Sequence, residues 1–166
     1  MNIEEVIAKQ EITELVGRYM RGLDRLDKGL LRSTFHDDAE TDYGFFKGDA
    51  DGFVAFADEA LRSHLANHHM IGQVNIELAG DIAYGEVYFQ AFHRIVENAK
   101  ELDLFIAGRY VDRYEKRNGE WKIAFRSEIN DWATEHPASD GFFARTPQTL
   151  RGARKPDDAL YRVKDR

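Results

Sequence analysis

The spacing of the apolar residues changes once along this chain, close to His69. Before that point they recur every three or four residues, which is the period of an amphipathic α-helix. After it they alternate with polar residues, which is the period of a half-buried β-strand. Helices followed by a run of strands favour an α+β fold with an antiparallel sheet, because a parallel sheet needs a crossover between successive strands.

Three helices are expected before the change in spacing, and four long strands after it. The expected helices cover residues 3–23, 27–35 and 53–65, with turns at 37–38 and at Gly48 and a strand over residues 39–46 that carries Tyr43. The expected long strands cover residues 70–78, 82–96, 102–115 and 121–132, with tight turns at 79–81 and 117–119. We expect residues 1–132 to form one compact body and residues 133–166, where the three prolines gather, to form an irregular arm of the same domain.

The composition argues against several classes of function. Because the chain has no cysteine, it has no disulfide, thiolate metal site or cysteine nucleophile, which fits a reducing compartment. A net charge of -7 opposes nucleic-acid binding, because phosphate recognition needs a concentrated basic surface. The N-terminus lacks a basic and apolar leader, and no stretch approaches the roughly 18 apolar residues of a membrane span. We therefore expect a cytoplasmic protein with no nucleic-acid or membrane partner.

Histidines gather near the change in spacing. His64 and His68 are four residues apart, a spacing that zinc sites use, but no acidic residue and no evident third histidine completes such a site. We therefore predict no metal, and expect both rings to face solvent. His69 and His93 fall on adjacent expected strands, where they either meet a common ligand or form ordinary hydrogen bonds to the backbone.

Asp24 and Tyr43 also have two interpretations each. Asp24 ends the first helix, where it either faces a pocket or pairs with Arg21 or Arg25 at the surface. The Tyr43 hydroxyl either polarises a substrate carbonyl or belongs to a packed strand tyrosine. The residues alone leave these alternatives open.

Residues 5–132 resemble the SnoaL-like branch of the nuclear-transport-factor-2-like superfamily. Scytalone dehydratases of that branch carry an aspartate at the end of the first helix, a tyrosine nineteen residues later, a histidine at a strand entry and a second histidine one strand on. The matching residues here are Asp24, Tyr43, His69 and His93. Hexachlorocyclohexane dehydrochlorinases keep only the aspartate and the first histidine. The resemblance implies a cystatin-like cone, in which N-terminal helices pack on a curved, mostly antiparallel sheet that encloses one pocket.

The resemblance also implies positions that contact substrate. Tyr19 matches a helix tyrosine of bile acid 7α-dehydratases, whereas Leu23 and Tyr110 replace residues that hold substrate in scytalone dehydratases. Arg126, with Arg109 as a second candidate, is the nearest counterpart of a late arginine in the dehydrochlorinases. The candidate substrate-binding residues are Tyr19, Leu23, Phe89, Tyr110, Arg126 and Asn130.

These matches imply a cofactor-independent lyase of the dehydratase type, or an isomerase, that acts on a hydrophobic cyclic small molecule. Asp24 would orient His69, the base that removes a proton, while Tyr43 polarises a carbonyl and His93 holds an oxygen. The alternative is a non-catalytic ligand-binding or structural subunit, such as the small subunit of ring-hydroxylating dioxygenases, which shares the fold. The resemblance further implies a homo-oligomer, with a trimer favoured and a dimer possible.

Overall fold

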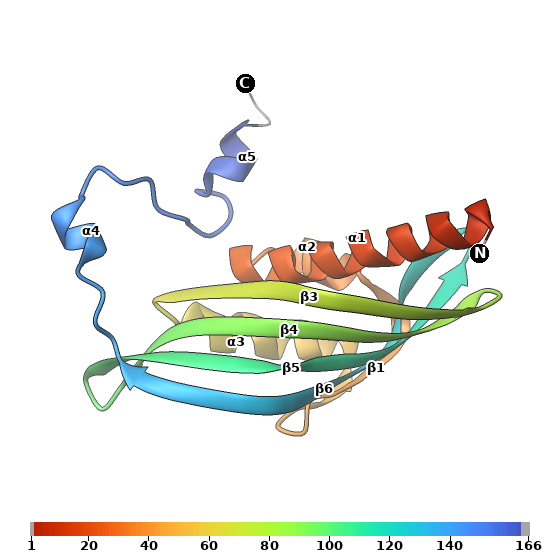
Figure 1. Ribbon diagram of the computed structural model, residues 1–166, viewed down its shortest axis with the longest axis horizontal. Helices are drawn as coiled ribbons and strands as arrows, with labels where there is room; N and C mark the ends of the chain where they lie inside the picture. Colours follow the sequence, from red (N-terminus) through yellow and green to blue (C-terminus); the bar gives the residue numbers. More distant parts are fainter. Residues whose placement is uncertain (1, 164–166) are drawn as a thin grey trace.

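A computed structural model describes residues 2–163 as helices packed on one face of a curved, open sheet of six strands (Figure 1). The strand order is β2-β1-β6-β5-β4-β3. This arrangement confirms the expected α+β fold. The elements are α1 (Ile3–Arg25), α2 (Lys28–Ser33), β1 (Phe35–Asp42), β2 (Lys47–Asp49), α3 (Ala50–Arg62), β3 (Ala66–Ala79), β4 (Ile82–Glu97), β5 (Lys100–Arg117), β6 (Glu120–Pro137), α4 (Phe142–Arg145) and α5 (Ala159–Val163).

The four long strands form an antiparallel meander, as the alternation predicted. Strand β1 joins this meander by pairing parallel with β6, so the sheet is mostly antiparallel. Strands β5 and β6 lose register between Ala107 and Gly108, which face Trp132 and Asn130 respectively. The extra residue, Asp131, makes a β-bulge, and such bulges bend a sheet. The bulge lies next to the part of the sheet that carries the candidate site.

Several expected element bounds near the short strands are wrong. The turn expected at Asp37-Asp38 lies inside β1, where Arg32 and Arg117 pair with the two carboxylates across 3.0 and 2.6 Å. The two aspartates lie at a register shift in the pairing of β1 with β6, between Phe35 and Glu40, so the backbone is irregular there but stays extended. Gly48 is likewise the middle residue of β2 instead of a turn.

Tyr43 lies just after β1, in the turn to β2, and its N–H donates to the carbonyl of Phe46 across 2.7 Å. Strand β3 begins at Ala66, earlier than expected, and α3 ends at Arg62. Strand β6 continues past residue 132 to Pro137, because residues 133–137 pair with residues 102–106 of β5. The ends of these strands thus depend on pairing with a neighbouring strand, which the pattern of one segment does not reveal.

Residues 138–163, which we call the arm, contain two short helices, α4 and α5, where irregular structure was expected. The arm turns back toward the C-terminal end of α1 (Figure 1). There Arg25 donates to the carbonyl of Ala153 across 2.8 Å, and both Lys155 and Tyr161 donate to Asp27, across 2.9 and 3.0 Å. The arm is therefore attached to the end of the first helix by polar contacts.

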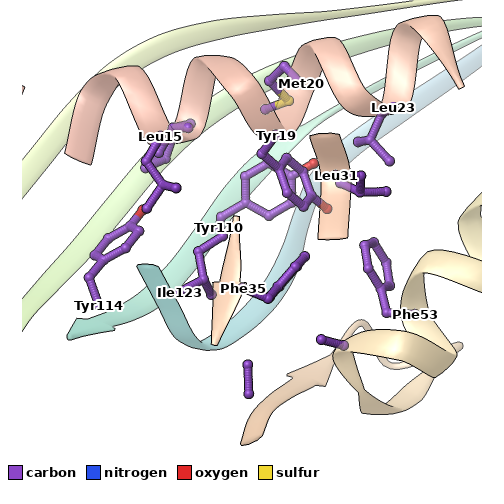
Figure 2. Close-up of a cluster of buried hydrophobic side chains, with 14 of the residues drawn as sticks. Leu15, Tyr19, Met20, Leu23, Leu31, Phe35, Phe53, Tyr110, Tyr114 and Ile123 are labelled. Carbon is purple, nitrogen blue, oxygen red and sulfur yellow. The ribbon is translucent and has the colours of Figure 1, made fainter. Parts of the chain in front are cut away.

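Aromatic rings fill the core between the helices and the sheet (Figure 2). Tyr19 of α1 lies against Phe53 of α3 and Tyr110 of β5, with ring centroids 6.2 and 5.7 Å away. Arg126 is fully buried, lies 4.1 and 4.2 Å from the Tyr19 and Tyr110 ring centroids, and forms a two-contact ion pair with Asp112. A charge buried this deeply needs such a partner. Among residues 2–163, no helix has the length and apolar character that crossing a membrane requires.

The bulge makes a test of the fold possible, because Gly108 leaves no room for a side chain. A Cβ atom there would lie 2.1 Å from the carbonyl oxygen of Ile129. We expect Gly108→Ala to lower the free energy of unfolding by about 1–3 kcal/mol, measured by urea denaturation. The matched control is Gly17→Ala in α1, where nothing lies within 4 Å and the exchange should raise helix stability by up to about 1 kcal/mol. Equal stability of Gly108→Ala and the parent would contradict the observed register.

Candidate active site

Asp24 is the penultimate residue of α1, and its carboxylate turns inward. Helix α1 ends tightly, because Leu26 takes a left-handed conformation and Gly22 lets the α2 residue Leu31 approach its backbone closely. The Asp24 side chain is 10% exposed and contacts β3, whereas Arg25 binds the arm. Of the two interpretations of Asp24, the structure therefore favours the inward-facing one over a surface ion pair.

The entry of β3 supplies three hydrogen-bond donors to this carboxylate. His69 donates from Nδ1 across 2.8 Å and from its backbone N–H across 3.1 Å, and the amide of Asn67 donates across 2.8 Å. Burial raises the pKa of Asp24, but the hydrogen bonds and the charge of His69 outweigh burial, so this pKa lies below its ordinary value. The carboxylate is thus held ionised, and Asn67 is a contributor that sequence reasoning missed.

The contact with Asp24 determines which nitrogen of His69 is available for chemistry. Because Nδ1 must carry hydrogen to donate to the carboxylate, the neutral ring has its lone pair on Nε2. An imidazole held in this way is suited to removing a proton, since the carboxylate stabilises the imidazolium that forms. The side chain of His69 is 7% exposed, so the pair is largely shielded from water.

His93 lies between His69 and His64. The His93 ring meets His69 edge to face with centroids 5.2 Å apart, and on its other side the Nδ1 atoms of His93 and His64 lie 3.1 Å apart. Burial, followed by the charges of His69 and His64, lowers the pKa of His93 to about 3, so the ring is neutral near pH 7. His64 is half-buried, so its expected exposure to solvent is wrong, whereas His68 is exposed as expected. Within residues 2–163, no three His, Asp or Glu side chains are placed to hold a metal ion.

Tyr43 belongs to a different cluster from Asp24 and His69. Its ring stacks on Phe53 at 4.5 Å, and its hydroxyl shares a hydrogen bond with the Tyr19 hydroxyl, the two oxygens being 2.6 Å apart. Burial raises the pKa of Tyr43 well above its ordinary value and that of Tyr19 to about 12. The structure therefore brings Asp24, His69 and His93 together and leaves Tyr43 in the aromatic core.

The candidate substrate-binding residues are distributed over the same inward face. Phe89 of β4 and Tyr110 of β5 are buried there and stack at 4.6 Å, while Asn130 of β6 is exposed. Arg126 is engaged by Asp112, although its Nη1 has no hydrogen-bond partner. Leu23 is buried beside Leu31 and Leu61, around a small hollow of about 10 Å³. Arg109, the second arginine candidate, instead lies on the opposite face, bound to Glu86 and Asp131.

The space expected to be a single enclosed pocket is occupied around Tyr43 by stacked rings. The larger depressions include one of about 560 Å³ near the start of α1 and one of about 480 Å³ at the bulge. The second is lined by Met70, Tyr88 and Trp132 among others. Access to His69 is therefore not provided by either depression.

Glu128 is a further inward-facing group that sequence reasoning missed. It stands opposite Tyr110, between Arg126 and Asn130 along the inward face of β6. Burial raises the pKa of Glu128, despite hydrogen bonds with Asn130 and Tyr110 and the nearby charges of His69 and Arg126. The period-two alternation of polar residues in this strand is the signal that would have found it.

The arm covers the end of the domain where Asp24 lies. Arg154 donates to the backbone carbonyl of Asp24 and, across 3.4 Å, to that of Leu61. Both carbonyls lie near helix ends, where backbone acceptors lack helical partners. The guanidinium group therefore joins α1, α3 and the arm beside the candidate site.

A model of the SnoaL-like domain family matches residues 4–127 of this chain. A hexachlorocyclohexane dehydrochlorinase of type 2 (LinA) has a similar structure, with 23% identity and a TM-score of 0.74 over 86% of this chain and 100% of that one. A candidate scytalone dehydratase from Novosphingobium aromaticivorans has 19% identity and a TM-score of 0.74 over 96% and 99%. A cystatin-like protein of unknown function from Nostoc punctiforme has 22% identity and a TM-score of 0.63 over 74% and 90%. No curated protein matches the chain significantly.

The lowered pKa of Asp24 leads to a prediction about stability and pH. A carboxyl group whose pKa is lower in the folded than in the unfolded protein contributes stability above the unfolded value of about 3.9, and loses it as the pH falls through the folded value. We expect Asp24→Asn to cost about 1.5–3 kcal/mol at pH 7, and the difference from the parent to shrink below pH 4. Urea denaturation at several pH values measures both effects.

The control for this prediction is Asp37→Asn, which removes an exposed carboxylate paired with Arg32. Exposed ion pairs contribute little, so this variant should follow the parent at each pH. A penalty for Asp24→Asn that stayed constant down to pH 2 would show that the charge of Asp24 is not what stabilises the fold.

Proposed function

The chain belongs to the SnoaL-like domain family, and from that premise we propose that it is a lyase of the dehydratase type, or an isomerase, with Asp24 and His69 as its general-base dyad. The observation that carries this proposal is the 2.8 Å hydrogen bond between Asp24 Oδ1 and His69 Nδ1, formed between two side chains that are at most 10% exposed. Their burial matters because a carboxylate that water does not screen stabilises an imidazolium more strongly.

The proposed reaction begins with proton transfer to His69. Nε2 takes a proton from a substrate carbon, and the electron pair left behind forms a carbon–carbon double bond. In an elimination, the neighbouring carbon loses its leaving group together with the bonding electron pair. In an isomerisation, the new double bond displaces the electron pair of an existing neighbouring double bond, and the imidazolium returns the proton to the carbon that receives this pair. Asp24 keeps the ring oriented and stabilises its positive charge throughout.

The residues around the dyad support a hydrophobic cyclic substrate. Ile71, Ala91 and Ile106 lie on the inward face next to His69, and the Phe89–Tyr110 stack extends this apolar surface. We assign His93, a neutral ring beside the base, to an oxygen of the substrate or leaving group. A catalytic role for Tyr43 would require its hydrogen bond with Tyr19 to open.

The filled interior around Tyr43 favours a second candidate function. A non-catalytic ligand-binding or structural subunit, like the small subunit of ring-hydroxylating dioxygenases, needs the fold but no open pocket. That role predicts a larger protein partner and no turnover that depends on His69. The experiment below separates it from the enzyme.

We also propose self-association through the sheet face that points away from the helices, here called the outer face, with a trimer favoured. This face exposes several large apolar side chains, which on a monomer would contact water. They are Met70, Tyr84, Tyr88, Phe105, Val111, Ile129 and Trp132. A cytoplasmic location also stays a prediction, based on the absence of cysteine.

The dyad is tested by His69→Gln and Asp24→Asn on a panel of hydroxylated cyclic ketones and halogenated rings. We expect kcat/KM to fall by about 10²- to 10⁴-fold in both variants, because the base or its orientation is lost. The loss should lie mainly in kcat, since the substrate's apolar contacts remain. Steady-state kinetics with circular dichroism as a check on folding measures this.

The matched control is His68→Gln, which changes the adjacent exposed histidine and should retain parental kinetics. Full activity of folded His69→Gln would remove the dyad. Failure of the parent to turn over any compound, together with co-purification of a larger protein, would favour the subunit role.

A further inference from the structure

Three imidazole rings stand in a row near the C-terminal ends of α1 and α3. His69 comes from β3, His93 from β4, and His64 from the turn that follows α3. The centroids of His69 and His93 are 5.2 Å apart, and those of His93 and His64 are 4.9 Å apart; both pairs meet at 76°. Each outer ring therefore touches the central ring of His93.

The backbone places His64 beside His93. The N–H of His64 donates to the carbonyl of Leu61 across 3.2 Å, which closes the turn after α3. The next residue, Leu65, donates to the carbonyl of Arg94 across 2.8 Å, and Arg94 directly follows His93 in β4. Because the backbone is tied on both sides of the contact, the His64 ring is held in position by the fold.

The Nδ1–Nδ1 distance of 3.1 Å implies one shared hydrogen between the two rings. Two Nδ1 lone pairs, or two Nδ1–H groups, would repel at that separation, so one ring donates and the other accepts. Burial lowers the pKa of both rings, and the charges of Arg154 on the arm and of His69 on β3 act in the same direction. The charge of Asp24 on α1 raises the pKa of His93, but the pKa stays below its ordinary value. Both rings are therefore neutral, and each has one N–H.

We infer that His64 is a positioning residue that donates its Nδ1–H to Nδ1 of His93, so that His93 carries its own hydrogen on Nε2. His64 is the ring better able to donate, because it is half-buried and its Nε2 can accept a hydrogen bond from solvent. His93 is 7% exposed, so solvent reaches its ring less easily than it reaches the ring of His64. With Nδ1 acting as the acceptor, the neutral His93 ring keeps its one hydrogen on Nε2.

The consequence for catalysis rests on the proposed function. A neutral His93 with hydrogen on Nε2 offers a donor to a substrate oxygen and does not compete with His69 for the proton that is removed. Because His93 stays uncharged, it also does not repel the imidazolium of His69 as it forms. His64 would thus act on the substrate through His93 and without touching the substrate.

The test is a long-range proton–nitrogen NMR spectrum of the full-length protein labelled with ¹⁵N-histidine, at pH 7 and without substrate. We expect His93 to show an unprotonated Nδ1 and a protonated Nε2, and His64 to show the reverse. His64→Phe should remove this preference, so that the His93 nitrogens shift toward averaged values. His64→Asn should restore it, because the amide can donate to Nδ1. The control His68→Asn should leave the His93 signals unchanged.

Kinetics gives a second, independent readout. With a substrate from the panel, kcat/KM should fall by about 2- to 13-fold in His64→Phe, the effect of losing one hydrogen bond between neutral groups, and recover in His64→Asn. An Nδ1-protonated His93 in the parent, or unchanged His93 signals in folded His64→Phe, would overturn the inference. The spectrum needs no substrate, so a parent that turns over nothing would remove the proposed function while the NMR result still decides the tautomer.

Discussion

The hydrogen bonds around the Asp24 carboxylate hold together parts of the molecule that lie far apart in sequence. Helix α1 supplies the carboxylate, β3 supplies three donors through Asn67 and His69, and the arm reaches the carbonyl of the same residue through Arg154. A buried carboxylate without such donors would be costly, so the end of α1, the entry of β3 and the arm depend on one another. The orientation of His69, and through it the proposed chemistry, follows from this arrangement.

The interior is divided into two regions of different character. In one region, Tyr19, Tyr43 and Phe53 pack as a closed aromatic cluster, and the hydroxyl groups of the two tyrosines share a hydrogen bond. At the C-terminal ends of α1 and α3, polar side chains gather around His69 and His93, and the inward face of β6 becomes exposed at Asn130. The proposed dyad of Asp24 and His69 therefore lies outside the closed aromatic cluster, among polar side chains.

Much of this fold could be predicted from the sequence, because helical and strand periods depend on burial that each segment shows by itself. The change in period near His69 predicted the helices and the meander, and the resemblance pointed to Asp24 and His69. Contacts between distant segments could not be predicted in this way. The extended course of β1 through Asp37-Asp38 depends on pairing with β6 on either side of them. The hydrogen bond of Tyr43 depends on Tyr19, and the contact of His64 with His93 depends on how a turn meets β4. Glu128 was missed although its alternation with Arg126 was visible.

The buried ion pair of Arg126 with Asp112 has a consequence for how the chain finds its structure. The two residues face each other directly across β5 and β6. Sliding one strand by a single position would turn one of them to the outer face and leave the other charge alone among aromatic rings. A misaligned β5–β6 hairpin would thus be less stable than the native one, so this ion pair helps to select the register of the longest strand pair of the sheet.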